Sequence, residues 1–348
     1  MLAVYELLPH LSIAQHIVCH GHHNEFDNDQ RKELWKLMLV TKYQLKKQAV
    51  FKSFEEFKNK DISNVPPNDR NMLGVNADSR RTTPNDISRQ SLVSCLHKYY
   101  LFYPNTAYWS AQTCFIVPFL YVFNDMKDGS ISTDINVEYD AYLCYSSLVS
   151  HAWLTHCHGN DDKLKERLLK IDNFWARHND NGRGNAREML ECYIGRRAGD
   201  ILSDQALKCL EPKLYQKLNE LDVTTIYYGH KPSIFFLFYV LGNNRSENEM
   251  VIKFFDYLIL FGFGNVLLWQ IAFLILKKEE IMQSQSFDTL IVLINDCSNK
   301  PNWDFDVLCG IVHQLRHKLK KKNPELLKYI MEHGSDVDVV IEILGKYC

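Results

Sequence analysis

The sequence has no excess of charge of either sign and lacks the motifs of the common nucleotide-binding enzymes. Its 40 lysines and arginines nearly balance its 42 aspartates and glutamates, which gives a formal net charge of -2. Without a global positive field the chain has no general hold on a polyanion, so we expect no nucleic-acid partner. The patterns GxxxxGKS/T, GxGxxG, HExxH and GxSxG are all absent, which argues against a nucleotide-binding or hydrolytic enzyme of the usual types.

The ten cysteines include no CxxC pair. Scattered thiols of this kind are typical of a reduced intracellular protein, so the cytoplasm is the expected compartment. Two short segments gather residues of the types that bind metals: Cys19, His20, His22 and His23 in the first, and His156, Cys157 and His158 in the second. Neighbouring residues in so short a run cannot easily all reach one tetrahedral ion, so we favour polar loops and expect no bound metal.

A long uncharged apolar run spans residues 257–276. Twenty such residues can cross a bilayer as a helix, so a membrane-embedded helical protein is one hypothesis. However, Asn265 and Gln270 lie inside the run, and Gly262 and Gly264 divide it. Two buried helices joined by a glycine-containing turn fit the same pattern, and we favour them over stable membrane insertion.

Strand-like alternation of polar and apolar residues is hard to find, whereas helical stripes recur. The clearest stripe has the i, i+3, i+4, i+7, i+8 spacing of an amphipathic helix and comprises Leu92, Cys95, Leu96, Tyr99 and Tyr100. Pro104 is expected to end this helix. Shorter stripes occupy residues 34–39 and the segment after Pro212, a proline in the tolerated first turn. We therefore expect an all-α fold.

Three polar stretches interrupt the helical pattern and are predicted to be loops: residues 60–88, 124–138 and 158–190. The character of the sequence changes after the third, which places a lobe boundary near residue 185. The expected organisation is an N-terminal lobe of residues 1–185 and a C-terminal lobe with its tail of residues 186–348.

The strongest cationic run covers residues 316–322, just before Asn323 and Pro324. Cations at the C-terminal end of a helix interact favourably with its dipole, so a solvated helix end is the simplest interpretation. A docking surface for an acidic partner or an anionic membrane is the alternative.

An arginine that could contact a partner lies in the first polar stretch, in the segment VNADSRRTTP of residues 75–84. Arg81 is predicted to sit on a polar loop just before the helix around Leu92. An arginine placed there can reach out from a rigid body toward a partner. A plain surface arginine, or an ion pair at the helix cap, is the alternative.

Several motifs resemble those of the TBC (Tre-2/Bub/Cdc16) family of regulators of small GTPases. The family's IxxDxxRT motif is matched, with valine for isoleucine, by Val75, Asp78, Arg81 and Thr82. Its early arginine–tryptophan element and its RxWD element are matched in part by Arg31 and Trp35 and by Lys253, Phe255 and Asp256. The resemblance runs from about Arg31 to Leu276 and implies a two-lobed, all-α TBC (Rab-GAP) domain.

Within the family, short segments are most similar to the fungal spindle-position checkpoint subunits, which form one half of a two-component GTPase-activating protein restraining mitotic exit or septation. These segments lie at residues 118–122, 212–214, 232–234 and 255–263. The similarity implies a role in the cell cycle, a second subunit or scaffold as a further partner, and recruitment to spindle-pole or centrosome-like structures.

The resemblance implies that Arg81 is an arginine finger for a Rab/Ras-like small GTPase. Such an arginine neutralises charge that develops on the phosphates during GTP hydrolysis and is worth on the order of 10³ to 10⁵ in rate. The GTPase would hold GTP and Mg²⁺, so this chain needs no cofactor of its own. Four further residues would support the motif or contact the GTPase: Asp78, Thr82, Tyr108 and Trp109.

The family's second catalytic residue, the glutamine of YxQGM, is missing. The motif aligns without a gap to Tyr108, Trp109, Ser110, Ala111 and Gln112, which puts Ser110 in place of the glutamine. A serine hydroxyl is too short to orient the attacking water as a carboxamide does. Gln112 could replace it only after a local backbone shift. Two hypotheses follow: a GTPase activator of reduced or partner-dependent activity, and a non-catalytic scaffold that keeps the fold only to hold a partner.

Overall fold

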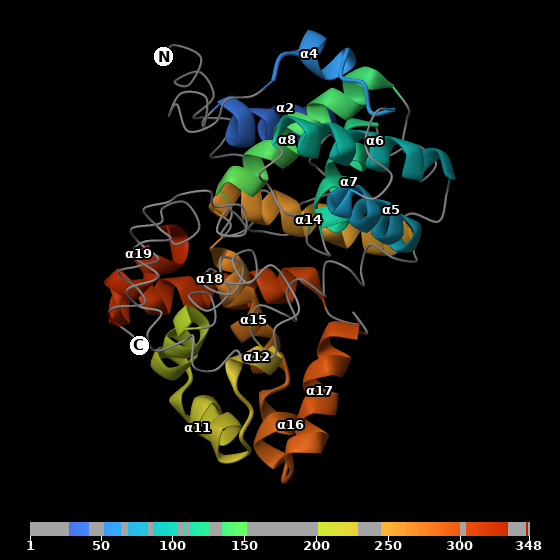
Figure 1. Cartoon of the computed structure of the whole chain (residues 1–348). Coiled ribbons are helices and arrows are strands. Elements are labelled where there is room, and N and C mark those ends of the chain that lie inside the picture. The colour runs from blue at the N-terminus through green and yellow to red at the C-terminus, as the bar shows by residue number, and fades with distance from the viewer. Residues whose placement is uncertain are drawn as a thin grey trace.

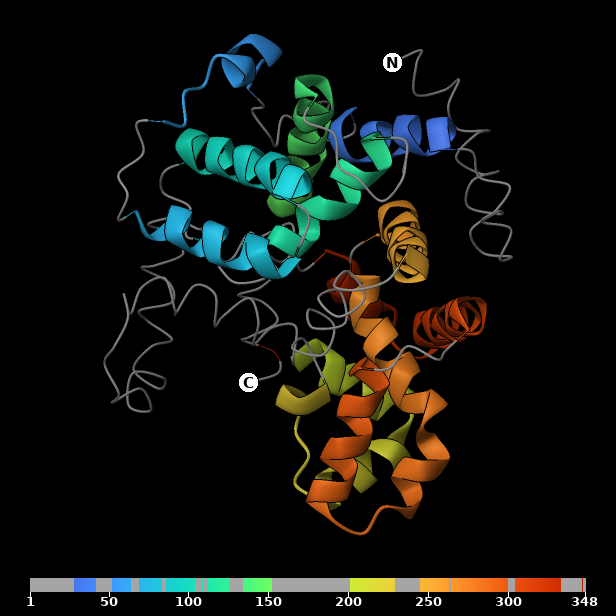
Figure 2. The same cartoon turned by 90° about the vertical axis from the view of Figure 1, so that its right-hand side faces the viewer.

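The computed structural model describes residues 28–41, 52–63, 69–82, 86–103, 108, 112–124, 134–151, 201–228, 245–262, 264–299, 304–332 and 346. All regular structure within these ranges is helical, which confirms the expected all-α fold. The helices gather in two groups, which Figure 1 shows above and below one another and Figure 2 shows from the side. The expected boundary near residue 185 lies outside the described residues.

The first group contains α2 (Asn28–Lys36), the π-helix η2 (Leu37–Thr41), α4 (Phe54–Lys58), α5 (Arg70–Thr82), α6 (Asp86–Phe102), α7 (Gln112–Phe123) and α8 (Ile135–His151). The second contains the helical residues 201–210, α11 (Pro212–Glu220), α12 (Thr225–Tyr228), α15 (Asn265–Leu276), α16 (Lys278–Gln283), α17 (Phe287–Asn299), α18 (Phe305–Lys322) and α19 (Pro324–Glu332). Helix α14 (Arg245–Phe261) contacts α2, η2 and α7 of the first group as well as α15 of the second. It therefore joins the two groups (Figure 1).

Helix α6 packs within the first group and contacts α5, α7 and α8. Its predicted stripe, from Leu92 to Tyr100, is buried in the core, because residues at this spacing share one helix face. The helix ends at Phe102, two residues before Pro104, as expected.

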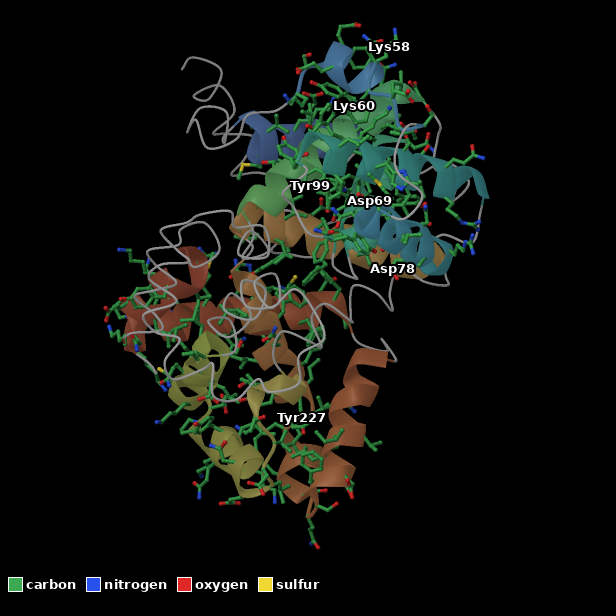
Figure 3. All side chains as sticks on the ribbon, viewed as in Figure 1. Lys58, Lys60, Asp69, Asp78, Tyr99 and Tyr227 are labelled. Atoms are coloured by element: carbon green, nitrogen blue, oxygen red, sulfur yellow. The ribbon has the colours of Figure 1, made fainter. Side chains whose placement is uncertain are left out.

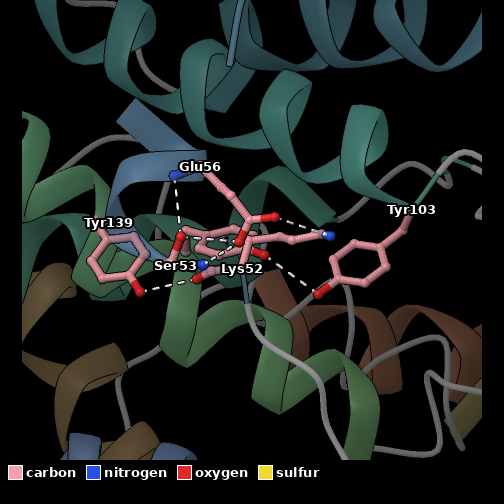
Figure 4. Close-up of polar contacts among 6 residues, drawn as sticks. Lys52, Ser53, Glu56, Tyr103 and Tyr139 are labelled. Carbon is pink, nitrogen blue, oxygen red and sulfur yellow. Dashed lines mark hydrogen bonds and ion pairs between the residues drawn. The ribbon is translucent and has the colours of Figure 1, made fainter. Parts of the chain in front are cut away.

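Helix α4 is a short helix that is fixed at its start and along one side (Figure 4). Ser53 and Glu56 form a capping box, in which each side chain accepts a hydrogen bond from the other residue's backbone N–H. The Tyr139 hydroxyl of α8 donates to the Lys52 carbonyl at 3.0 Å. Phe57 is fully buried beneath the Lys98 ammonium, which lies 4.2 Å from its ring centroid. These contacts hold α4 against α6 and α8.

The apolar run at residues 257–276 forms parts of two helices, α14 and α15, as expected. Gly262, between them, has φ +98°, a backbone conformation that other residues rarely adopt. A Cβ at Gly264 would lie 1.9 Å from the Ile330 carbonyl oxygen, so only glycine allows α15 to begin so close to α19. Among the described residues, no helix combines the length and the apolarity that crossing a membrane requires.

The cationic run at residues 316–322 is the exposed end of α18, as the simplest interpretation predicted. Leu315 and Leu319 are buried on the opposite side. Lys322 donates to the Cys209 carbonyl at 3.2 Å, which fixes the end of α18 to the helical residues 201–210.

Two of the predicted loops are partly wrong. The stretch 60–88 contains all of α5 and the start of α6, and the stretch 124–138 contains the first turn of α8. Both stretches are rich in polar residues. However, helices α5 and α8 each begin directly after an aspartate whose carboxylate accepts a hydrogen bond from a backbone N–H of the first turn. Asp69 accepts from Met72, and Asp134 accepts from Asn136. The third predicted loop lies outside the described residues.

Candidate functional site

Helix α5 carries the candidate arginine and presents a mostly polar stripe to its neighbours. It begins at the Asp69 cap and ends at Thr82, and Figure 3 labels Asp69 and Asp78 along it. The helix contacts α6 and α7. Its inward residues recur at intervals of three or four, the spacing of one helix face, and comprise Asn71, Gly74, Asp78 and Thr82.

Tyr108 is fastened to this stripe at three points. Its backbone N–H donates to the Asn71 side-chain oxygen at 2.8 Å, and its hydroxyl donates to the Asp78 carboxylate at 2.5 Å. Between these bonds the ring crosses Gly74, where an added Cβ would lie only 2.3 Å from a ring carbon. Because both ends and the middle of Tyr108 are held, its position along α5 is fixed. We call Asn71, Gly74, Asp78 and Tyr108 the tyrosine clasp.

Thr82 connects the end of α5 to the start of α7. Its hydroxyl contacts the Asp78 backbone carbonyl at 2.9 Å, one turn earlier, and the Thr113 hydroxyl at 2.9 Å. Thr82, Thr113 and Asp78 are all buried. The hydrogen bond to Thr113 therefore fixes the end of α5 against the start of α7.

Arg81 lies on α5, one residue before the helix ends, and not on a loop as predicted. The correction follows from the Asp69 cap and from burial of Met72 and Val75, which make this polar segment helical. The structure describes the backbone of Arg81 but not its side chain. Because α5 is held by contacts along its inner face, the backbone of Arg81 has a fixed position, which a catalytic arginine requires.

Trp109 and Ser110 lie outside the described residues, directly after Tyr108. Gln112, the first residue of α7, is fully buried, and its side-chain oxygen accepts a hydrogen bond from the Tyr100 hydroxyl. In this arrangement the carboxamide of Gln112 lies inside the protein. The tyrosine clasp thus brings Asp78 and Tyr108 together, and Thr82 contacts the Asp78 backbone one turn later, whereas Gln112 faces inward.

Both histidine- and cysteine-rich segments singled out as alternative metal sites, residues 19–23 and 156–158, lie outside the described residues. Elsewhere, the described ranges hold no group of three or more His, Cys, Asp or Glu residues placed to share a metal ion.

A buried ion pair links the two ends of the sequence match. The Arg31 Nε–H on α2 lies 3.0 Å from each carboxylate oxygen of Asp256 on α14, and the Trp35 indole N–H donates to the same carboxylate at 2.8 Å. Burial raises the pKa of Asp256 to about 6, although Arg31 and Trp35 favour the charged form. The motif match named all three residues, but nothing in the sequence showed that they meet. Their role is to fix α14 on the first group of helices.

A model of the Rab-GTPase-TBC domain family matches residues 28–180. The mitotic check point protein BUB2 of Saccharomyces cerevisiae is 26% identical over 159 residues, which cover 44% of this chain and 47% of that protein. This chain thus matches about half the length of that curated relative.

Two solved structures share the fold. The Ypt/Rab-GAP domain of Gyp1p superimposes with a TM-score of 0.57 at 16% identity, over 88% of this chain and 91% of that one. The flagellar RabGAP TBC domain of Chlamydomonas gives 0.52 at 14% identity, over 83% and 81%. Residues 28–180 are thus similar to the Rab-GTPase-TBC domain family, and the chain has the all-helical fold of these two solved domains.

Proposed function

We propose that this protein regulates a Rab/Ras-like small GTPase in the manner of a GTPase-activating protein, with Arg81 as its arginine finger. The family match and the likeness to two Rab-GAP domains support the class of partner. The partial likeness to a mitotic check point protein supports a role in cell-cycle control. A second subunit as a further partner is implied only by the resemblance of the short sequence motifs.

The observation that carries the proposal is the tyrosine clasp. It joins α5, which bears Arg81, to Tyr108, which stands two residues before Ser110. The family resemblance assigns the two catalytic positions to residues 81 and 110, so the clasp fixes the backbone of one relative to the chain leading to the other. A positioned arginine acts by stabilising charge on the transferring phosphoryl group, and its effect depends on such placement.

Only the charge-stabilising half of the machinery is present in this chain. Ser110 cannot orient a water as a glutamine does, since its hydroxyl is short and lacks the amide's separate donor and acceptor. The buried Gln112 accepts a bond from Tyr100 and supplies no substitute in this arrangement. The water-orienting group then comes from the GTPase itself or from a partner subunit.

The test is single-turnover GTP hydrolysis by a panel of purified small GTPases, each mixed with an excess of this protein. We expect at least one GTPase to be accelerated, and Arg81→Ala to abolish the acceleration. Lys213→Ala serves as the matched control, because Lys213 is an exposed cation on α11 of the second group. If wild type and Arg81→Ala accelerate hydrolysis equally, the proposal is wrong.

A non-catalytic scaffold is the second candidate, and burial of Gln112 is the observation that favours it. A scaffold binds the GTP-bound GTPase without changing its hydrolysis rate. Measuring binding and hydrolysis on the same GTPase therefore separates the two functions.

A further inference from the structure

Helix α5 has an outer strip that is exposed and that no other described part of the chain covers. Residues at 73, 76, 77 and 80 are exposed, whereas those at 72, 75, 78, 79 and 82 are buried. At about 100° per residue, the four exposed positions fall within an arc of about 100° on the side away from the core. We call Leu73, Asn76, Ala77 and Arg80 the outer strip.

The outer strip has the composition of a contact surface more than of a solvated helix face. Leu73 is 52% exposed, which leaves a large apolar side chain in water on a helix that already has a buried face. Ala77 is small, so a partner can approach the helix closely at the middle of the strip. Isolated exposed apolar residues are common, and the case therefore rests on what lies next to Leu73.

Two arginines stand at the end of this strip. Arg80 is exposed and forms no ion pair within the described part of the chain. Position 81 follows Ala77 by one helical turn, which places it about 40° around the helix from Ala77. The strip therefore leads along α5 directly to the proposed arginine finger, with a second cation beside it.

We propose that the outer strip is the surface on which the small GTPase docks, with Arg80 as a determinant of affinity separate from the catalytic Arg81. The inference rests on the proposed function. Charge complementarity selects the occupant, because the nucleotide site of a GTPase carries the negative charge of GTP and the strip ends in two adjacent cations. The partner presents an apolar spot to Leu73 and Ala77 and an acidic or phosphate group to Arg80.

Arg80 is expected to change the binding affinity, whereas Arg81 is expected to change the hydrolysis rate at saturation. A contact made equally before and during hydrolysis strengthens binding without raising the rate at saturation. Loss of Leu73 or Arg80 should thus raise the concentration of this protein that gives half-maximal acceleration. The saturating rate should stay the same.

The test measures the affinity for the GTPase loaded with a non-hydrolysable GTP analogue, together with the hydrolysis rate as a function of regulator concentration. Leu73→Asp and Arg80→Glu should each weaken binding at least tenfold, and the Arg80→Glu effect should shrink at high salt. The controls are Val292→Asp, at a valine 60% exposed on α17, and Lys213→Glu on α11. Melting temperatures within about 2 °C of wild type show that the variants fold.

The outcomes separate the docking surface from the proposed function. If the strip variants bind like wild type while Arg81→Ala still abolishes acceleration, the docking inference is wrong and the proposed function stands. If the strip variants lose binding while Arg81→Ala changes no rate, the GTPase docks on the strip of a scaffold. Equal weakening by the two control variants also overturns the inference.

Discussion

The Arg31 guanidinium on α2 and the Asp256 carboxylate on α14 meet in a fully enclosed ion pair across 225 residues of sequence. The Trp35 indole N–H donates to the same carboxylate, so the buried Asp256 charge has two partners. This contact fixes α14 against the first group of helices. No local sequence pattern specifies that position of α14.

Removing one member of this pair should be far more costly than removing both. Asp256→Leu leaves the buried Arg31 charge without its partner and should cost about 3 to 5 kcal/mol of unfolding free energy. The double variant Arg31→Met/Asp256→Leu replaces both charges by apolar groups and should lose less stability than the single variant Asp256→Leu. Chemical denaturation of the four proteins measures the coupling. Additive losses would show that the two residues do not interact.

Stability should also depend on the protonation of Asp256. Burial raises its pKa from 3.8 to about 6. Between these values the folded carboxyl holds a proton that the unfolded one has lost, so this group lowers stability as pH rises from about 4 to about 6, by about 3 kcal/mol in all. Above pH 6 the contribution is constant.

Subtracting the profile of Asp256→Asn from that of wild type isolates this contribution, because the asparagine does not titrate. The difference in unfolding free energy should fall across that window. A difference that is flat there and instead rises with pH below about pH 4 would mean that Arg31 outweighs burial and lowers the pKa.

Phe255 should be a main support of the contact between α14 and the first group. It is fully buried, and its ring centroid lies 6.1 Å from that of Trp35 and 5.7 Å from that of Phe119. Phe255→Ala should cost about 3 to 5 kcal/mol, measured by denaturant unfolding. The control Val292→Ala removes an exposed side chain and should cost less than about 0.5 kcal/mol. Similar losses for both variants would contradict the burial of Phe255.

Gly74→Ala should reverse the usual effect of this substitution in a helix. Alanine normally stabilises a helix interior by about 1 kcal/mol relative to glycine. Here its Cβ overlaps the Tyr108 ring, so the variant should be less stable than wild type and should lose GTPase acceleration. In a Tyr108→Ala background the clash is gone, and Gly74→Ala should then stabilise the helix. Stabilisation in both backgrounds would show that the clasp does not hold Tyr108 against α5.

The sequence alone predicted the helices whose apolar stripes are regular. The stripe from Leu92 to Tyr100, the proline-started α11 and the division of residues 257–276 into two helices are all confirmed. Each depends on local spacing or on glycine and proline, which the sequence displays directly.

Sequence reasoning failed where the packing is polar or distant. Residues 70–82 are predicted to form a loop, because α5 buries the polar residues Asp78 and Thr82 as well as Met72 and Val75. Burial of this face of α5 depends on contact with Tyr108, which lies after α6 in the sequence. The Arg31–Asp256 pair likewise has no periodic signal, although the family motifs named both residues.

The proposed function implies that this chain keeps the arginine of the catalytic pair and lacks the glutamine. Ser110→Gln should restore the missing half, and its benefit should depend on Arg81 because the two groups act in one transition state. The double variant Ser110→Gln/Arg81→Ala has the new glutamine but not the arginine. It therefore controls for any change in hydrolysis rate that the glutamine makes by itself.

The decisive measurement is the single-turnover rate of GTP hydrolysis by the cognate GTPase, with this protein in excess so that differences in affinity do not enter. We expect Ser110→Gln to raise the rate above wild type and Arg81→Ala to abolish the gain. If Ser110→Gln leaves hydrolysis at the unassisted rate while the GTPase stays bound, the fold serves recognition alone and the assignment of Arg81 as an arginine finger is wrong.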